Sequence, residues 1–184
     1  GNIYLSTLLN TRTPIDGRLA LEIALNILQM PSLKNLDLQV KWPNDLYSTQ
    51  GKWGGILVEP LSPHQVIVGV GINLAPIPKE NIDQHATSLS ELGLTNISRT
   101  QLIAELYMAI QQASEWFDHD CYNLAVRFNH YAAFKNQAVE FEHHSGLCSG
   151  IFIGIQDDGA VNIETSAGVQ QFYQGRLRRL ETSL

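Results

Sequence analysis

The sequence predicts an α+β protein in which helices pack on a mixed β-sheet and a small all-β unit follows. Two observations support this fold class. Up to residue 131, apolar runs of strand length alternate with segments of helical period. From Ala138 onward the apolar period switches to two, and glycines separate short segments. The change of period predicts two units, residues 1–135 and residues 136–184.

The first unit is expected to open with a strand, a helix and a second strand. Residues 2–9 have the aromatic and apolar content of a strand, and the turn-forming residues of 11–17 end it. Apolar side chains within 19–30 recur at the spacing of one helical face, and Pro31 ends that pattern. Over 36–40 leucine and valine alternate with polar residues, which predicts a half-buried strand.

Further along, residues 56–58 and 66–70 are short β-branched runs bounded by Gly or Pro. Such runs predict adjacent buried strands. A polar loop with prolines is expected over 75–86. Helical periodicity then predicts helices over 100–117 and 122–131, and the first of these carries an apolar core stripe of Leu102, Leu106 and Ile110.

Charge and cysteine content exclude several functional classes. The net charge of -6 predicts a surface that repels phosphate backbones, so this chain is not expected to bind nucleic acid. Two cysteines do not make a disulfide framework, which favours a reducing cytoplasm. The sequence has no apolar run long enough to span a bilayer and no signal pattern. It begins with Gly1 directly before a β-like segment, which predicts missing upstream sequence.

Three short blocks could carry chemistry. The first, Lys-Trp-Pro-Asn-Asp at 41–45, is a stiff turn that displays a cation, an amide and a carboxylate. The second, Gly-Lys-Trp-Gly-Gly at 51–55, precedes a buried strand, where glycines permit close approach of a ligand to the backbone. The third, Gly-Val-Gly-Ile-Asn at 69–73, removes side-chain bulk from a β-branched strand.

Each block alone has an ordinary structural interpretation: a polar turn, a hairpin with a solvated lysine, and close packing of another backbone. Together they carry more weight, because three interruptions of apolar β-segments between residues 41 and 73 could line one crevice. The ordered triple, at these spacings, resembles the signature of the biotin protein ligases. The similarity covers essentially the whole chain, and the β unit is similar to the SH3-like C-terminal domain of bacterial members.

The resemblance implies that residues 1–135 form an N-terminally truncated catalytic domain with a class II synthetase-like fold. It implies an SH3-like β-barrel over residues 136–184. It implies an enzyme that uses ATP to convert biotin to biotinyl-5′-AMP and transfers biotin to a lysine of the biotin carboxyl carrier protein of acetyl-CoA carboxylase. Mg²⁺ is expected to arrive with the ATP, without a metal site in the protein. The resemblance also implies a cytoplasmic location. Whether the protein forms a homodimer is left open.

Residue roles follow from positions in the three motifs. Lys52 resembles the lysine that contacts the biotin carboxylate and the adenylate phosphate. Asp45 resembles the carboxylate that helps the acceptor lysine lose its proton, and Lys41 could offset phosphate charge. Expected biotin or nucleotide contacts also include Trp42, Asn44, Gly54, Gly55, Leu57, Gly69, Gly71, Ile72 and Asn73.

The sequence departs from the family in one respect and leaves two alternatives open. Family members carry a Gly/Arg-rich loop upstream of the strand at 2–9, and this sequence has none. Lipoate ligases or octanoyl transferases share the catalytic fold, although the first block and the β unit favour biotin. A non-catalytic module that binds biotinyl-adenylate or mediates dimerisation is the other alternative.

Three further clusters are interpreted as structural. The pair His143 and His144 with Cys148 fits no closed zinc site, because a second ligand pair is missing. The arginines 176, 178 and 179 are expected on a solvated strand edge. The run Asp-His-Asp at 118–120 is expected to cap a helix end.

Overall fold

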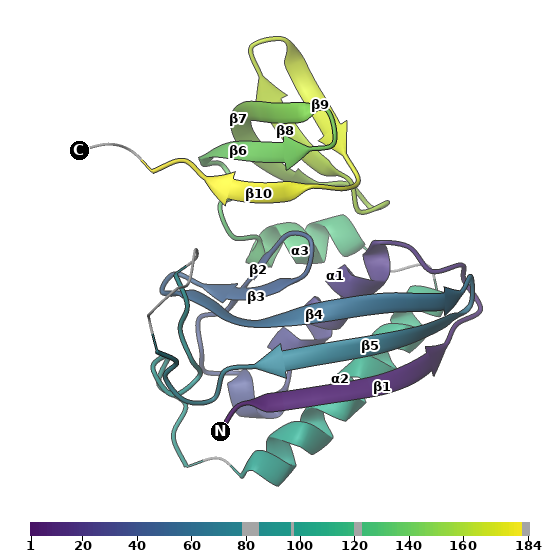
Figure 1. The fold of residues 1–184 in the computed structure, drawn as a ribbon, viewed down its shortest axis with the longest axis vertical. Helices are drawn as coiled ribbons and strands as arrows, with labels where there is room; N and C mark the ends of the chain where they lie inside the picture. The colour runs from purple at the N-terminus through teal and green to yellow at the C-terminus, as the bar shows by residue number, and fades with distance from the viewer. Residues whose placement is uncertain (79–84, 97, 120–122, 182–184) are drawn as a thin grey trace.

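The architecture was taken from a computed structural model that describes residues 1–78, 85–96, 98–119 and 123–181. Two five-stranded sheets follow one another along the chain (Figure 1), and the buried apolar side chains of both belong to one hydrophobic cluster. The first sheet has the order β1-β5-β4-β3-β2 and the second has the order β10-β6-β7-β8-β9. This arrangement confirms the predicted α+β class with a small SH3-like β unit at the C-terminal end.

The first sheet and its helices occupy the chain up to residue 131. Its strands are β1 (Ile3–Asn10), β2 (Gln39–Lys41), β3 (Asp45–Ser48), β4 (Gly51–Ser62) and β5 (Gln65–Ile72). The helices are α1 (Arg18–Leu28), α2 (Arg99–Asp118) and α3 (Leu124–Tyr131), with a short 3-10 turn over Pro31–Leu33. All pairings between these strands are antiparallel. Among the described residues, the parallel pairing that a mixed sheet requires occurs only at two isolated bridges, Val40 with Ala132 and Lys52 with Ala86.

The second sheet begins just after α3. Its strands are β6 (Ala138–His143), β7 (Gly146–Ile155), β8 (Val161–Thr165), β9 (Gly168–Phe172) and β10 (Arg176–Arg179). They enclose a small core whose largest members are Phe141 and Phe152, both fully buried. The first residue of β6 lies close to the predicted unit boundary after residue 135, but the exact division of the chain into domains stays a prediction.

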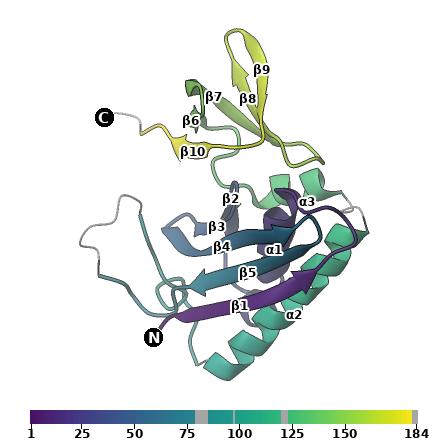
Figure 2. The ribbon, with the colours of Figure 1, turned by 45° about the vertical axis from the view of Figure 1, so that its right-hand side comes forward.

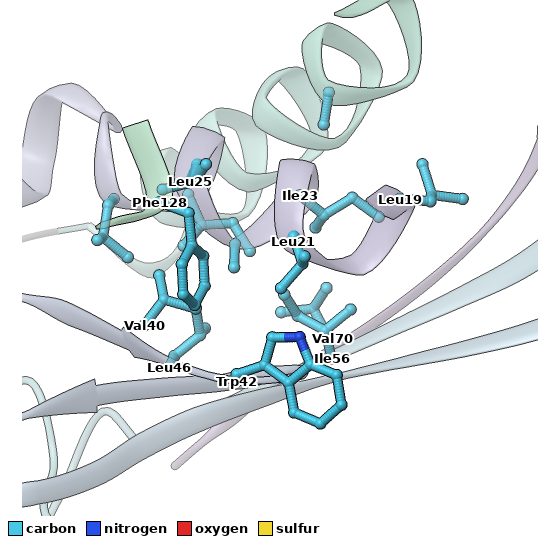
Figure 3. Close-up of a cluster of buried hydrophobic side chains, with 14 of the residues drawn as sticks. Leu19, Leu21, Ile23, Leu25, Val40, Trp42, Leu46, Ile56, Val70 and Phe128 are labelled. Carbon is cyan, nitrogen blue, oxygen red and sulfur yellow. The ribbon is translucent and has the colours of Figure 1, made fainter. Parts of the chain in front are cut away.

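Both α1 and α2 cover the same face of the first sheet and leave the other face open (Figures 1 and 2). Alternate residues of β5, from Val66 to Ile72, point into this helix-covered layer and are buried. Helix α1 is buried over nearly its whole length, because it lies between the sheet and α2. Figure 3 shows its leucines and isoleucines meeting side chains from the strands and from α3.

Most predicted elements have the expected type, and two boundaries differ. The predicted strand over 36–40 is only Gln39–Lys41, because the Leu36 N–H donates to the Leu33 carbonyl and continues the preceding turn. The strand predicted at 56–58 is much longer, Gly51–Ser62, so the second block lies inside it. Parts of the loop expected over 75–86 and the start of the helix expected at Tyr122 lie outside the described residues.

The helical layer contains a buried ion pair. Glu22 of α1 is fully buried and accepts two hydrogen bonds from the Arg127 guanidinium of α3, at 2.7 and 2.8 Å. That guanidinium also lies over the Trp116 ring of α2, 4.7 Å from its centroid. One side-chain cluster therefore joins all three helices.

Glu22→Gln is expected to lower the free energy of unfolding by about 3 kcal/mol, because it removes the charge of the fully buried carboxylate that pairs with the Arg127 guanidinium. Urea unfolding at neutral pH measures this loss. Asp16→Asn is the matched control: its pair with Arg18 is partly exposed, so its loss should cost less than about 1 kcal/mol. Equal losses in the two variants would contradict the importance of the buried pair.

Among the described residues, no helix is both long and apolar enough to cross a membrane.

Candidate active site

A cavity of about 350 Å³ lies on the open face of the first sheet. Its lining comes from β1, β3, β4, β5 and the turn before β3: Tyr4, Leu5, Ser6, Asn44, Asp45, Lys52, Gly55, Ile56, Leu57, Gly69, Val70 and Gly71. Small-molecule sites have volumes of this order. All three sequence blocks contribute to the cavity, as the idea of a shared crevice predicts.

Strand pairing explains why these residues share a face. Gly55 lies opposite both Asp45 and Gly71, and Leu57 lies opposite Gly69. Directly paired residues of neighbouring strands point to the same side of a sheet. The next residues along each strand, such as Ile56, are buried on the helix-covered side.

A β-bulge brings Lys52 onto this face. The pairing of β3 with β4 shifts between Leu46 and Tyr47: Leu46 lies opposite Gly54, whereas Tyr47 lies opposite Lys52. The bulge adds a residue to β4 and changes its alternation, so the Trp53 side chain is fully buried while Lys52 returns to the cavity side. Without the bulge, Lys52 would share the buried face with Gly54.

The glycines on the two faces have different surroundings. A Cβ added at Gly54 would lie 2.6 Å from the Gly71 carbonyl oxygen, so close packing of the backbone requires glycine there. A Cβ at Gly71 would meet only the Tyr4 ring at 3.5 Å, and one at Gly69 would meet Leu57 and Ser6 at 3.8 Å. Gly69 and Gly71 are therefore not demanded by packing, and they keep the cavity floor flat.

Asp45 is the centre of a charged cluster at the edge of the cavity. Its Oδ1 lies 2.7 Å from the Lys52 Nζ, and its Oδ2 lies 3.7 Å from the Lys41 Nζ. Lys52 is the more accessible of the two lysines, with 38% of its side chain exposed. An anion entering the cavity could therefore bind Lys52 without displacing buried side chains.

Lys41 is nearly buried beside this cluster, with its ammonium 5.9 Å from the Tyr47 ring centroid. Burial lowers the pKa of Lys41 below that of an ordinary lysine, against the opposing charge of Asp45. The positive charges of Lys52 and Arg178 lower this pKa further. Lys41 pairs with the Asp45 carboxylate and does not line the cavity.

Asn44 fixes the turn to the neighbouring strand. Its Nδ2 donates to the Ile56 carbonyl at 2.9 Å, and its own carbonyl accepts from the Ile56 N–H at 3.0 Å. These bonds hold the residue before Asp45 against β4, so Asp45 has a defined position.

Five of the expected site residues do not line the cavity: Lys41, Trp42, Gly54, Ile72 and Asn73. The Trp42 indole is 3% exposed and lies in the core, as Figure 3 shows, so it cannot contact a ligand there. Ile72 points into the helix-covered layer. The Asn73 amide donates to the Thr87 carbonyl at 3.1 Å and thereby holds the segment that returns along β4.

Sequence reasoning missed five lining residues: Tyr4, Leu5 and Ser6 of β1, Ile56 of β4 and Val70 of β5. Tyr4 is 80% exposed although it lies in a regular strand opposite Gly71. The β1 residues line the cavity because β1 pairs with the glycine-rich β5 and shares its open face, a pairing that the sequence did not predict.

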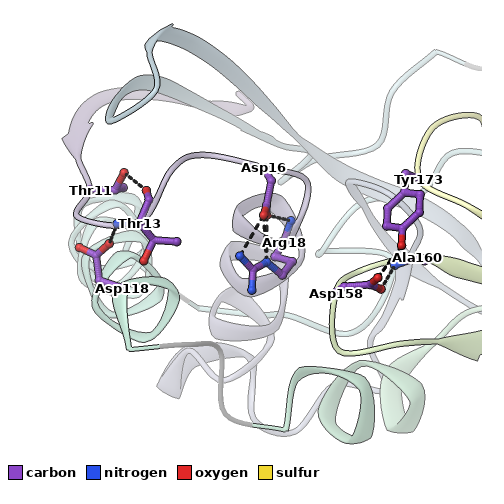
Figure 4. Close-up of polar contacts among 8 residues, drawn as sticks. All are labelled: Thr11, Thr13, Asp16, Arg18, Asp118, Asp158, Ala160 and Tyr173. Atoms are coloured by element: carbon purple, nitrogen blue, oxygen red, sulfur yellow. Dashed lines mark hydrogen bonds and ion pairs between the residues drawn. The ribbon is translucent and has the colours of Figure 1, made fainter.

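The histidine–cysteine, arginine and Asp118 clusters, which the sequence analysis interpreted as structural, lie outside the cavity. His143 packs against Phe172, with centroids 4.8 Å apart, and the Cys148 thiol is buried. The described residues contain no group of three His, Cys, Asp or Glu side chains arranged to hold a metal. The arginines of β10 are exposed. Asp118 accepts the N–H groups of Arg12 and Thr13, so it anchors the loop after β1 (Figure 4), while Asp120 lies outside the described residues.

Comparison with known proteins agrees with this geometry. Residues 4–73, which hold all three blocks, match the biotin/lipoate A/B protein ligase family. The bifunctional ligase/repressor BirA of Escherichia coli is 29% identical over 188 residues, which cover 96% of this chain and 58% of the relative. The chain thus spans little more than half the length of the curated relatives it matches.

Solved structures extend the similarity over nearly the whole chain. A mutant biotin protein ligase from Aquifex aeolicus in complex with biotin has a TM-score of 0.87 and 26% identity, covering 98% of this chain and 79% of that one. The ligase of the same organism in complex with biotin and ATP has a TM-score of 0.82 and 27% identity over equal shares. Residues 4–73 thus resemble the biotin/lipoate A/B protein ligase family, and nearly the whole chain is similar to BirA-type biotin ligases.

Proposed function

We propose that this chain activates biotin with ATP to give biotinyl-5′-AMP and transfers biotin to a lysine of a biotin carboxyl carrier protein. One observation carries the proposal: the lysine, the carboxylate and the bare glycine strands of the three family blocks line one cavity. Relatives named as biotin ligases, including one solved with biotin and ATP, support the choice of substrates. The acceptor protein and a homodimer are parts of the same proposal that rest on the family resemblance.

In the first step a biotin carboxylate oxygen attacks the α-phosphorus of ATP, and the bond to the departing pyrophosphate breaks. Negative charge builds on the phosphate oxygens during this step, and a fixed positive charge nearby stabilises it. We assign that role to Lys52, because it lies at the cavity and is accessible. Mg²⁺ bound to the nucleotide would neutralise further phosphate charge.

In the second step the acceptor amine attacks the acyl carbon, and AMP leaves. An ammonium ion has no lone pair, so the acceptor lysine must lose a proton before it can attack. Asp45 is the carboxylate of the cavity and is held by Asn44 and two lysines, so we assign proton removal to it. We place the reaction in the cytoplasm, which suits the free buried thiol of Cys148.

Pyrophosphate release tests the proposal. The chain is incubated with ATP and Mg²⁺ together with biotin, lipoate or octanoate, and release is expected with biotin only. A carrier protein added afterwards should gain the mass of one biotinyl group, biotin less one water, on one lysine. Turnover with lipoate in place of biotin would identify a lipoate ligase, and binding of biotin without pyrophosphate release would identify a non-catalytic module.

Gly71→Ala is expected to raise the KM for biotin about 10- to 100-fold, since a methyl group on a closely filled surface costs about 1–3 kcal/mol. Its stability should be unchanged or slightly higher, because the new Cβ meets only the Tyr4 ring at ordinary contact distance. Biotin titration of the initial rate and thermal unfolding measure the two effects.

Gly54→Ala is the matched control for that variant. The new Cβ would clash with the backbone of Gly71 on the buried face, so stability should fall by about 1–3 kcal/mol. An unchanged KM in the Gly71 variant would remove β5 from the proposed biotin site.

A further inference from the structure

Trp42 connects the turn that carries Lys41 and Asp45 to the second sheet. Its Nε1–H donates to the Gly159 carbonyl at 3.0 Å, and its ring lies 5.6 Å from the Phe141 centroid. Both partners belong to the second unit, between β7 and β8 and on β6. The second unit therefore holds the Trp42 side chain, which lies in the chain between Lys41 and Asp45.

The segment that receives the indole N–H is itself well fixed. The Gly159 N–H donates to the Gln156 carbonyl at 2.9 Å, and the Gln156 N–H donates to the Ala160 carbonyl at 3.0 Å. Asp158 accepts from the Ala160 N–H at 3.1 Å and from the Tyr173 hydroxyl at 2.5 Å, as Figure 4 shows. The Gly159 carbonyl is thus presented to Trp42 by a closed, cross-bonded turn.

Gly159 also lies tightly against the first unit. Its φ of +88° lies in the region that favours glycine, and an added Cβ would lie 3.3 Å from the Arg18 side chain. The neighbouring Asp157 carboxylate accepts the Ala125 N–H in the first turn of α3, at 3.0 Å. The turn between β7 and β8 therefore contacts the first unit at α1, at α3 and at Trp42.

Two additional contacts secure the docked sheet. The Asn129 side chain of α3 accepts from the Ile155 N–H at 2.8 Å and donates to the Ile155 carbonyl at 3.1 Å. On the other side of the turn, the Val40 carbonyl accepts the Ala133 N–H at 2.9 Å. Residue 40 is held by the segment that leads to the second sheet, and residue 42 is held by the sheet itself.

We propose that Trp42 is a positioning residue, through which the second sheet fixes the turn that sets Asp45 at the cavity and the buried Lys41 beside it. The kinetic part of this inference rests on the proposed biotin-ligase function. Trp42 does not touch the cavity, and its effect on the reaction passes through Asp45, three residues along the same turn. The second sheet thereby contributes to the site although the cavity lining comes from the first.

Trp42→Phe tests the inference, because it removes the N–H donor and keeps an aromatic ring in the core. Trp116→Phe, a half-exposed site on α2, is the control. The first readout is acetylation of Lys41 by acetic anhydride, followed by mass spectrometry and scaled to the exposed Lys34. Loss of one hydrogen bond of about 1 kcal/mol should raise Lys41 labelling about fivefold in the Trp42 variant only.

The second readout is the ratio of the two half-reactions. Transfer from preformed biotinyl-5′-AMP to the carrier protein should fall about fivefold more than pyrophosphate release, because transfer depends on Asp45. A smaller folded fraction would lower both rates equally and leave the ratio unchanged. Unchanged Lys41 labelling, or an equal loss in both half-reactions, overturns the inference. Failure of the unsubstituted chain to release pyrophosphate contradicts the proposed function instead, and Lys41 labelling then decides the inference alone.

Discussion

Replacement of Lys52 by alanine is expected to lower the rate of pyrophosphate release about 100- to 1,000-fold, the usual effect of losing one group that stabilises transition-state charge. Lys52 is the accessible cation of the cavity, and Lys41 is too deeply buried to replace it. Asp45 would then face the incoming phosphate without its closest counter-ion, which adds repulsion to the loss of attraction. Initial rates at saturating biotin and ATP measure the effect.

The fold should survive this change. The Lys52 side chain is well exposed and its pair with Asp45 is partly screened by water, so the free energy of unfolding should change by less than about 1 kcal/mol. Lys34→Ala, an exposed lysine near the 3-10 turn, serves as control and should leave both properties unchanged. Pyrophosphate release at the normal rate from a folded Lys52→Ala protein would remove Lys52 from the mechanism.

The sequence predicted the strands and helices well where their periodicity was strong. Helix α2 shows this best, because Leu102, Leu106 and Ile110 repeat at helical spacing and are all buried. The strand expected from Leu36 failed for a local reason: Leu36 and Leu38 alternate with polar residues, yet the backbone before Leu38 continues the turn of the 3-10 helix. Alternation alone cannot distinguish a short strand from buried positions in a turn.

The position of Lys52 could not have been derived from strand alternation. Counting back from the buried Ile56 in steps of two places both Gly54 and Lys52 on the helix-covered face. The bulge near Trp53 reverses this assignment, and a bulge depends on the pairing partner as well as on the strand itself. The family motif pointed to Lys52 because a motif records the outcome of such pairing, and Lys52 lines the cavity, while its role stays a prediction.

Trp42 shows the opposite limit of motif reasoning. Its place between Lys41 and Asp45 suggested contact with a ligand, but the indole points into the core and donates to the second sheet. The donor's partner lies more than a hundred positions further along the chain. A contact between units at that separation leaves no periodic signal, so only the folded arrangement reveals it.

Asp45→Asn is expected to slow transfer of biotin to the carrier protein about 100- to 10,000-fold, the range for removal of a general base. Asparagine has nearly the same shape and can still accept a hydrogen bond from Lys52, so the cavity should keep its form. Pyrophosphate release should fall much less, because the first step needs no proton removal by this carboxylate. Single-turnover transfer from preformed biotinyl-5′-AMP separates the two steps.

The pH dependence of transfer distinguishes a lost base from a distorted site. Without Asp45, only the small fraction of acceptor lysine that is already neutral can attack, and this fraction rises about tenfold per pH unit below the pKa of the amine. The Asp45→Asn rate should therefore increase steeply with pH, whereas the unsubstituted protein should show a flatter profile. Asp37→Asn, at an exposed carboxylate, controls for the change in net charge. A reduced rate with the same pH profile as the unsubstituted protein would instead mean that Asp45 orders the two lysines and takes no proton.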